Sequence, residues 1–417
     1  MKILQIHKYY SRKRGGGSMT AFFETCELLR KKGEEVIIFS MKDKKNESSS
    51  YEKYFAEHFD INDAKNLWQK IRLVPKIIWN SEAQKKLEKL IQDEKPDVAH
   101  IHNIYHYLTP AIIHTLKKYD IPVVFKLSDY KAICPNYKLF IEGKLCERCR
   151  GGKYYNCFLH KCLKNSRSAS FVGMLEAYVH KCKKSYEKID LFLAPSIFMK
   201  NKCVEFGIPE NKIKILRNAI NMEEYENFPV QEEKDCILYF GRISEEKGIA
   251  DLIKAIKKLF EENKLGNNKL LVVGNGPQKN ELKKLTQELK IENKIEFTGP
   301  KYGEELKKII SQSKFVVVPS VWYDNSPLVV SEAQLLEKPV VISDLGGTPE
   351  MIIPEKSGYI FKAGDSEDLA EKIEKMLGLS QEERRQMGQI GRENIEKIND
   401  PEEYYKKLKS VYLSLQA

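Results

Sequence analysis

KFVVVPSVWYDNSPLVVSEA, residues 314–333, has the pattern of a buried strand, a turn and the start of a helix. The apolar run ends at Ser320, and the turn that follows holds Asp324. Ser326 followed by Pro327 is typical of a helix N-cap and the first helical residue. A strand followed directly by a helix predicts one repeating unit of a parallel α/β fold.

The start of this predicted helix has the features of an anion-binding site. The backbone N–H groups of Leu328 and Val329 would have no partners within the helix, so they could bind a phosphate. Asp324 precedes these groups, and Glu332 lies roughly 7–8 Å further along the helix at about 1.5 Å per residue. The stretch therefore predicts a ligand with a sugar at one end, a diphosphate in the middle and a ribose at the other end.

The same alternation of strands and helices runs through the chain in two series. Nearly continuous apolar strands separated by helices predict parallel sheets that are covered on both faces. Strands are expected at 2–6, 36–40, 97–102, 122–127, 190–195 and 212–216, and then at 236–240, 269–274, 294–299, 314–320 and 339–343.

These two series predict two doubly wound α/β domains. The first is expected to span residues 1–225 and the second residues 236–395, because the charged segment between them has no periodic apolar face. A chain of 417 residues is too long for one hydrophobic core, which agrees with two domains. A last amphipathic helix, residues 400–417, could cross back onto the first domain.

Composition and charge limit the class of protein. With 42% hydrophobic and 31% charged residues, and no apolar run near the roughly 18–20 residues of a membrane span, we expect a cytoplasmic globular protein. Residues 126–188 hold 14 Lys or Arg and five Asp or Glu, so they carry most of the net charge of +11. This excess favours an anionic partner, although a solvated Lys-rich surface would have the same composition.

A second basic stretch, NLWQKIRLVPKIIWN at 66–80, places Trp68 and Trp79 among Lys and Arg residues. Such a composition suits a peripheral contact at the inner face of the cell membrane. The alternative is that both Trp side chains belong to the core or to a lid.

Four strand-to-helix turns of the second domain carry unusual residues. Ligands of open α/β sheets bind at the carboxyl ends of the strands, so these turns are expected to lie together. Cations beside helix N-termini suit a diphosphate, and glycines let a ligand approach the backbone. The turns hold Gly241, Arg242 and Lys247; then Gly274 and Gly276; then Asp324 to Glu332; and finally Gly346 and Gly347, where Thr348 and Pro349 again have the pattern of a helix start. The GxGxxG fingerprint is absent from the first βα turn of both predicted domains, which favours a nucleotide sugar over NAD.

These motifs resemble those of the retaining glycosyltransferases of family 4, in a subgroup with a Cys-rich segment in the N-terminal domain. The resemblance covers essentially the whole chain. It rests on GRISEEKG (241–248), GNGP (274–277), the carboxylates at 324 and 332, LGGTPE (345–350), SGYIF (357–361), GGGS (15–18), HIHN (100–103), LSDYKAICP (127–135) and RNAI (217–220). It implies the GT-B fold, in which two Rossmann-like domains face each other across a cleft.

The resemblance also implies an activity. A hexose would be moved, with retention of configuration, from a nucleotide-diphosphate sugar such as a UDP or GDP sugar to a saccharide or lipid-linked saccharide, in polysaccharide or glycolipid biosynthesis. No metal cofactor would be needed for catalysis, because Arg242 and Lys247 would stabilise the leaving diphosphate.

Further roles follow from the same resemblance. Glu332 would bind the ribose and Asp324 the transferred sugar, while Gly16 would approach the donor from the first domain. The donor site would be completed by ten further residues of the four turns: Gly241, Gly274, Gly276, Asn325, Ser326, Pro327, Leu328, Val329, Gly346 and Gly347.

Two positions depart from the pattern of that family. The first carboxylate is more often Glu, whereas Asp324 is one methylene shorter. The residue before Asp129 is often His, whereas here Ser128 cannot act as a base. Asp129 could still orient the acceptor hydroxyl; the alternative is that it only caps a turn.

Five of the nine cysteines lie close together in the basic segment: Cys134, Cys146, Cys149, Cys157 and Cys162. They fall within 131–170, a segment that interrupts the βα alternation and is expected to shape the acceptor site. Their spacing, with one CxxC pair, is compatible with a structural zinc ion. Free thiols are the main alternative, and an iron–sulfur site or disulfides are others.

Two other functions fit parts of the sequence. A sugar-nucleotide 2-epimerase shares the GT-B architecture, but it would need acid/base groups near C2 of the sugar. A nucleic-acid-binding protein could use the basic Cys-rich segment, but the diphosphate turns would then have no purpose. We therefore expect a nucleotide-sugar donor and a saccharide acceptor as partners, and no nucleic acid.

Overall fold

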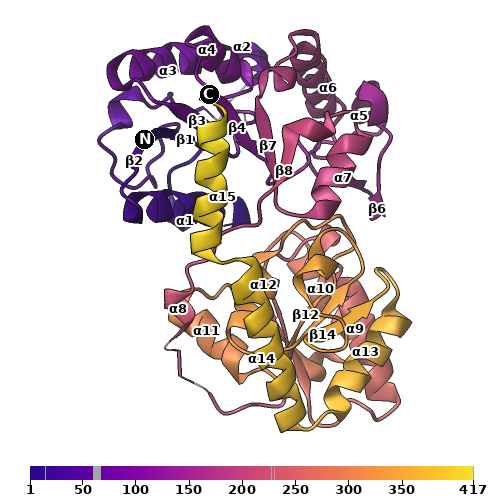
Figure 1. Cartoon of the computed structure of the whole chain (residues 1–417). Coiled ribbons are helices and arrows are strands. Elements are labelled where there is room, and N and C mark those ends of the chain that lie inside the picture. Colours follow the sequence, from indigo (N-terminus) through magenta and orange to yellow (C-terminus); the bar gives the residue numbers. More distant parts are fainter. Residues whose placement is uncertain (15, 60–66, 227, 230, 417) are drawn as a thin grey trace. The chain divides into compact units, whose positions relative to one another are not determined.

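A computed structural model describes residues 1–14, 16–59, 67–226, 228–229 and 231–416. The chain divides into two compact units (Figure 1). Unit 1 consists of Met1–Leu139, Cys146–Ile220 and Pro401–Ala417, and unit 2 of Phe140–Leu145 and Asn221–Asp400. Each unit is built around a six-stranded parallel sheet, which confirms the predicted α/β architecture.

The sheet of unit 1 has the strand order β2-β1-β3-β4-β7-β8. All neighbouring strands are parallel. The strand after β1 lies on one side of it and the next strand, β3, lies on the other, so the strand order reverses at β1. The strands are β1 (Lys2–Ile6), β2 (Glu35–Phe39), β3 (Val98–Ile101), β4 (Val123–Lys126), β7 (Leu191–Ala194) and β8 (Ile213–Ile215).

The sheet of unit 2 has the order β11-β10-β9-β12-β13-β14 and is also parallel throughout. Here the order reverses at β9, between β10 and β12. The strands are β9 (Cys236–Phe240), β10 (Lys269–Val273), β11 (Ile295–Gly299), β12 (Phe315–Val318), β13 (Val340–Ser343) and β14 (Gly358–Phe361). A separate antiparallel hairpin is formed by β5 (Phe140–Ile141) and β6 (Lys144–Leu145).

Helices connect the strands and cover both sheets. In unit 1 they are α1 (Gly17–Lys31), α2 (Leu67–Ile78), α3 (Ser81–Glu94), α4 (Ala111–Lys118), α5 (Tyr155–Leu159), α6 (Arg167–Cys182), α7 (Ile197–Glu205) and α15 (Pro401–Ser414). In unit 2 they are α8 (Glu223–Glu226), α9 (Ile249–Glu261), α10 (Lys279–Glu288), α11 (Gly303–Gln312), α12 (Leu328–Leu335), α13 (Ser366–Gly378) and α14 (Gln381–Ile398).

Each unit has its own hydrophobic core, because the central strands of each sheet bury apolar residues on both faces. All four residues of β12 are buried, and so are all four of β13. In unit 2 these strands pack with Leu252, Ile253 and Ile256 of α9. In unit 1 the strands pack with Phe22 and Phe23 of α1.

The last helix, α15, belongs to unit 1, where it lies beside α1 (Figure 1). The Tyr404 hydroxyl is 3.0 Å from Thr25 Oγ1 of α1, and the Tyr412 hydroxyl is 2.8 Å from Nδ1 of the buried His100. Leu408 and Val411 join the same core. The helix therefore supplies core residues and is not a peripheral addition.

Several elements differ from the sequence-based expectation. The strand β14 was not among the predicted strands. It is only four residues long, and the sequence analysis included it only as part of the motif SGYIF. The helix α14 runs to Ile398, past the expected domain end at residue 395.

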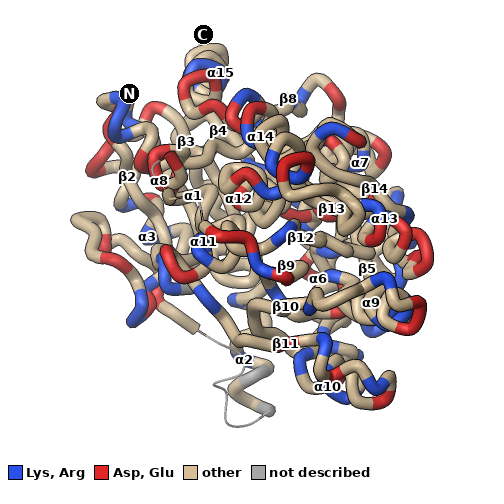
Figure 2. The backbone as a smooth tube through the Cα atoms, turned by 90° about the horizontal axis from the view of Figure 1, so that it is seen from below, with Lys and Arg blue, Asp and Glu red and all other residues tan. Residues whose placement is uncertain are grey.

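Charged side chains cover the outer helices with both signs. Figure 2 shows Lys and Arg interspersed with Asp and Glu along α11 and α13. Several of these residues pair within a helix, as Lys257–Glu261 of α9 and Lys372–Asp368 of α13 do. In the described part of the chain, no helix is long and apolar enough to cross a membrane.

Candidate functional site

The reversal of strand order in unit 2 identifies the edge at which a ligand would bind. In open α/β sheets the crevice lies outside the carboxyl ends of the strands at which the order reverses. Here that point lies between β9 and β12, which are hydrogen-bonded neighbours. The turn after β9 carries Arg242 and Lys247, and the turn after β12 carries Asp324. The structure thus brings together two turns that are far apart in the sequence.

The side chains of Lys247 and Asp324 form an ion pair. Asp324 is buried, and its Oδ2 also accepts a hydrogen bond of 3.2 Å from Ser320 Oγ. The ammonium of Lys247 lies 5.4 Å from the ring centroid of Trp322, within the range of a cation–π contact. One cation and one carboxylate are thus held at the edge of the sheet by residues of both turns.

Arg242 lies in the same turn as Lys247 and has an exposed side chain. Its backbone is fixed, because the Tyr239 hydroxyl donates a 2.7 Å hydrogen bond to the Arg242 carbonyl. No partner for its guanidinium is present among the residues that the structure describes, so the group can bind an anion from solution.

The helix after Asp324 begins one residue later than predicted. Pro327, with an extended backbone, is the N-cap of α12, and Ser326 precedes it without a capping hydrogen bond. The first bond at this end joins the Val330 N–H to the Pro327 carbonyl at 3.1 Å. The amides of Leu328 and Val329 come before that bond, so the predicted anion-binding amides keep their place at the helix start.

The fourth turn differs more from the prediction. Thr348–Met351 is a single turn of 3₁₀ helix with Gly347 as its N-cap, so Thr348 does not cap an α-helix. Such a short turn has little aligned dipole to attract an anion. The prediction of a second helix N-terminus at the site was therefore wrong.

Glu332 lies on α12, and burial raises the pKa of its carboxyl to about 7, although the ammonium of Lys307 opposes the rise. Lys307 in turn donates a 2.7 Å hydrogen bond to the Glu224 carbonyl. Near neutral pH this carboxyl is therefore present in both protonation states.

The glycines of these turns are required by neighbouring backbone. A Cβ on Gly274 would lie 1.9 Å from the Gly241 carbonyl oxygen, and one on Gly276 would lie 2.0 Å from that of Ile243. Gly346, with φ 72°, would place a Cβ 2.1 Å from the Asp324 carbonyl oxygen. These contacts pack the second turn against the first and the fourth turn against the third. Sequence reasoning did not supply this reason for glycine.

The turn that holds Asp324 is tied to the fourth turn by a backbone bond. The Gly347 N–H donates to the Asp324 carbonyl at 2.7 Å. Around these turns, three buried polar atoms have no partner among the described residues: Ser244 Oγ, Trp322 Nε1 and Thr348 Oγ1. Unpaired buried polar atoms are uncommon in native proteins, and three of them gather at this edge.

Asp129 of unit 1 follows β4 and is held by several partners. Its Oδ2 accepts hydrogen bonds from the Tyr105 hydroxyl and, at 3.4 Å, from Asn103 Nδ2. Its Oδ1 accepts from the Lys131 amide at 2.9 Å. Burial raises the pKa of Asp129, and the Tyr105 hydrogen bond opposes that rise. The bond to Lys131 matches the turn-capping alternative, and the other bonds orient the carboxylate.

Gly16 is the N-cap of α1 and has φ 95°, a conformation that favours glycine. A Cβ there would meet no atom within 4 Å, so the position is open. Gly16 and Asp129 both belong to unit 1, while Arg242, Lys247, Asp324 and Glu332 belong to unit 2.

A cavity of about 320 Å³ lies in unit 1 beneath the Cys-rich segment, and sequence reasoning missed it. Its wall includes Lys131, Glu176 and His180. Glu176 is fully buried in α6, with Lys131 Nζ at 2.8 Å and His106 Nδ1 at 3.3 Å from its Oε2. A Glu inside the helix FVGMLEAYVHKC was the available signal, since an isolated carboxylate on a buried helix face needs a cation.

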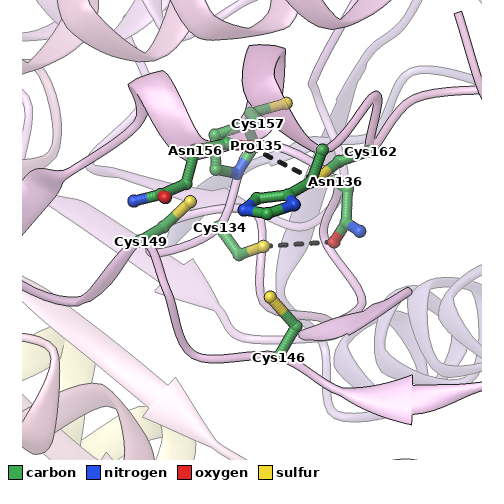
Figure 3. Close-up of a pocket in the computed structure, with 9 residues that line it drawn as sticks. Cys134, Pro135, Asn136, Cys146, Cys149, Asn156, Cys157 and Cys162 are labelled. Atoms are coloured by element: carbon green, nitrogen blue, oxygen red, sulfur yellow. Dashed lines mark hydrogen bonds between the residues drawn. The ribbon is translucent and has the colours of Figure 1, made fainter. Parts of the chain in front are cut away.

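The five clustered cysteines line one small pocket in unit 1 (Figure 3). None of them is in a disulfide. In the described part of the chain, no group of three or more His, Cys, Asp and Glu side chains already has the geometry of a metal site.

Comparison with known proteins agrees with this organisation. Residues 222–394 match the family model "Glycosyl transferases group 1", and residues 16–131 match "Glycosyl transferase 4-like". Among solved structures, the Anabaena protein HepE in complex with UDP is similar, with 15% identity, a TM-score of 0.70, and coverage of 99% of this chain and 100% of that chain. The fold is therefore the GT-B fold of solved glycosyltransferases.

Curated relatives match over shorter lengths. An uncharacterised glycosyltransferase of Methanocaldococcus jannaschii is 31% identical over 206 residues, which cover 46% of this chain and 52% of the relative. The capsular polysaccharide biosynthesis glycosyltransferase CapM of Staphylococcus aureus is 28% identical over 257 residues, which cover 54% and 63%. The chain thus spans about half the length of the curated relatives it matches.

Proposed function

We propose that the protein is a retaining glycosyltransferase that moves a hexose from a nucleotide-diphosphate sugar to a saccharide or lipid-linked saccharide. The observation that carries this proposal is the ion pair between Lys247 and Asp324 at the reversal point of the unit 2 sheet, beside the start of α12 and the exposed Arg242. Cations and helix amides at this point suit a diphosphate, and a carboxylate suits the hydroxyl groups of a sugar.

In this proposal the diphosphate of the donor binds the cationic side chains. The phosphate oxygens bind Arg242, Lys247 and the amides of Leu328 and Val329. Lys247 then exchanges part of its contact with Asp324 for the phosphate, and the released carboxylate accepts hydrogen bonds from the sugar. Binding of the donor would thus assemble the sugar site.

The reaction needs charge stabilisation at the leaving group. The bond from the sugar C1 to the diphosphate oxygen breaks, and the electron pair leaves with the nucleoside diphosphate. The acceptor oxygen forms a bond to C1 on the same face, and its proton leaves with the diphosphate. Arg242 and Lys247 supply positive charge where negative charge develops, so no catalytic metal ion is required.

Glu332 is proposed to bind the ribose hydroxyls. A carboxyl group inside the first turns of α12 lies further from the diphosphate than Asp324 does, at a distance that a nucleoside spans. Its ionised form accepts hydrogen bonds from both ribose hydroxyls, so nucleotide binding is coupled to its protonation.

The acceptor is assigned to unit 1. Asp129, fixed by Tyr105, would orient the acceptor hydroxyl, and Gly16 would leave room for the donor. The cavity beside Lys131 and the basic Cys-rich segment favour an anionic acceptor, such as a lipid-linked pyrophosphate sugar. Trp68 of α2 is 75% exposed, which would suit peripheral contact with the inner membrane surface that carries such an acceptor.

The comparisons support the class of reaction and not the specific substrate. HepE was solved with UDP-glucose as well as with UDP. The relatives include proteins described as glycosyltransferases of colanic acid and amylovoran biosynthesis. A sugar-nucleotide 2-epimerase and a nucleic-acid-binding protein are less consistent with an ion pair placed at a diphosphate site.

A thermal-shift panel tests the donor site. UDP, GDP, ADP and their hexose conjugates are added to the full chain without divalent metal, and a ligand at 100 times its Kd should stabilise the protein by about 2.7 kcal/mol. Arg242→Ala and Lys247→Ala should abolish the shift, while Lys254→Ala, an exposed residue of α9, should keep it. No shift with any nucleotide would overturn the donor assignment. A shift without transfer of labelled sugar to any glycan acceptor would favour the epimerase alternative.

A further inference from the structure

The Cys-rich segment is held together by little regular structure. Between residues 131 and 166 it contains only the two-residue strands β5 and β6, a 3₁₀ turn and the five-residue helix α5. Six non-glycine residues in this stretch have positive φ, a conformation that L-residues avoid: Tyr137, Leu139, Glu142, Lys161, Lys164 and Asn165. Small regions of this kind need a staple such as a metal ion or a disulfide.

The cysteines of the segment come from four separate places in the chain and meet at one pocket. Cys134 lies in the turn after β4, Cys146 follows β6, Cys149 precedes the 3₁₀ turn at Arg150, and Cys162 follows α5. Figure 3 shows the thiols of Cys146, Cys149 and Cys134 around the same space. The pocket has room for one water-sized sphere, about 10 Å³.

The thiols have only weak partners in this arrangement. Cys134 Sγ donates to Asn136 Oδ1 at 3.1 Å, and Cys162 Sγ lies 3.9 Å from the Asn156 carbonyl oxygen (Figure 3).

The fifth cysteine differs from the other four. Cys157 Sγ lies 4.0 Å from the place of a Cβ at Gly173, so it faces α6. Its thiol is also a hydrogen-bond partner of the Cys162 thiol. Cys157 thus packs the helix α5 against α6 at the edge of the same pocket, and a Cys157 variant tests whether it is a ligand.

We propose that Cys134, Cys146, Cys149 and Cys162 bind one structural Zn²⁺ as four thiolates. Zinc in structural sites is tetrahedral and takes cysteine ligands, two of them commonly spaced as CxxC, as Cys146 and Cys149 are. The side chains turn about their Cα–Cβ bonds to reach the ion, since they are not yet in coordinating geometry. Room for a single sphere favours one ion over an iron–sulfur cluster.

The charge of the segment agrees with such a centre. Four thiolates around Zn²⁺ carry a net charge of −2, and the segment around them is strongly basic. The excess of Lys and Arg in the segment would balance the negative charge of this centre.

Metal analysis of the full chain tests the proposal directly. Protein purified under reducing conditions without chelator or added metal should contain about one zinc per chain and no stoichiometric iron. Replacement of the ion by Co²⁺ should give the thiolate charge-transfer band of a tetrahedral site. Binding should weaken steeply as pH falls, because the thiols must lose their protons.

Matched variants identify the ligands. Cys146→Ser and Cys149→Ser should each lose most of the zinc, whereas Cys157→Ala, Cys182→Ser and His160→Ala should keep it. If a ligand variant does not fold, the zinc content and the Co²⁺ spectrum of the wild-type protein still test whether the site binds zinc. A folded wild-type protein without metal, or full zinc retention in the Cys146→Ser/Cys149→Ser double variant, would overturn the assignment. Stoichiometric iron together with sulfide would show that the cysteines bind an iron–sulfur cluster. Fewer titratable thiols in the denatured, unreduced protein would show that they form a disulfide.

Discussion

Lys247 and Asp324 form an ion pair although 77 positions separate them, and each follows one of the two strands between which the order of the unit 2 sheet reverses. Because Lys247 pairs with Asp324, a donor phosphate that binds Lys247 would take the place of this carboxylate. Donor binding and rearrangement of this pair are therefore linked.

The first prediction concerns Asp324→Asn. Removal of the carboxylate frees Lys247 for the phosphates, so the Kd of the nucleoside diphosphate should stay equal or fall. The kcat of sugar transfer should fall on the order of 10²-fold, because the sugar loses an orienting group. Isothermal titration and a radiolabel transfer assay measure the two quantities. Asp251→Asn, on the outside of α9, is the control, and parallel losses of affinity and kcat would contradict the proposed division of roles.

The second prediction concerns Gly346→Ala. A Cβ at this position would lie 2.1 Å from the Asp324 carbonyl oxygen, and φ is 72°. The free energy of unfolding should fall by about 2–3 kcal/mol, of which a residue with positive φ accounts for roughly 1–2 kcal/mol. Gly364→Ala has φ 78° and no atom within 4 Å of its Cβ, so it isolates the conformational part. Urea denaturation measures the free energy of unfolding of both variants. Equal losses in Gly346→Ala and Gly364→Ala would show that the contact with Asp324 does not destabilise the protein.

The third prediction follows from Glu332. Its pKa of about 7 in the folded protein lies above the value of 4.5 expected when unfolded, so the folded state binds more protons between these values. Stability should therefore decline as pH rises from about 4.5 through 7. Glu332→Gln should equal wild type near pH 4 and exceed it at pH 8 on the order of 1–3 kcal/mol.

The same variant should bind nucleotides more weakly at pH 8, where wild-type Glu332 is ionised and accepts the ribose hydroxyls. Chemical denaturation and nucleotide titration over pH 5–8 measure both effects. Glu371→Gln, at an exposed position of α13, should show neither effect. If Glu332→Gln gained stability but kept full affinity for the nucleotide, Glu332 would not bind the ribose.

The fourth prediction concerns Glu176. Burial acts to raise the pKa of Glu176, but the Lys131 ammonium and the His106 imidazole together hold it well below the usual range. Its contribution to stability should be present above about pH 4.5 and lost as pH falls toward the folded value. Glu176→Gln should cost about 3–5 kcal/mol at pH 7, because it leaves Lys131 buried without its partner. A Glu176→Met/Lys131→Met double variant should lose less than the single variant, and a larger loss would argue against the pair.

Local patterns were sufficient for the architecture. Continuous apolar strands such as FVVV and VVIS can only be buried on both faces, so the parallel sheets followed from the residues themselves. The order of the strands could not be read this way, because every strand looks alike in composition. The reversal at β9, which explains why Lys247 and Asp324 meet, depends on tertiary packing.

The site was predicted in part for the same reason. Lys247, Asp324 and Glu332 were chosen as candidates because charged residues close to the end of an apolar strand are conspicuous. Two neighbours of these carboxylates, Ser320 and Lys307, were not predicted, since they carry no unusual local signal. The reason for glycine at 274, 276 and 346 was also hidden, because the carbonyl oxygens that exclude a side chain come from other turns.

The position of α15 has a consequence for biosynthesis. Residues 1–139 and 146–220 of unit 1 are synthesised before most of unit 2, yet Tyr404, Leu408 and Tyr412 of the unit 1 core are synthesised after it. Unit 2, whose residues 221–400 are made before α15, can fold while unit 1 still lacks a helix. Unit 1 therefore completes its packing after unit 2, although most of it is synthesised earlier. Until α15 is made, Thr25 and His100 lack their hydrogen-bond partners Tyr404 and Tyr412. A nascent chain would therefore complete the core of unit 1 only after unit 2 has been synthesised, and chaperones could act on the open core until then.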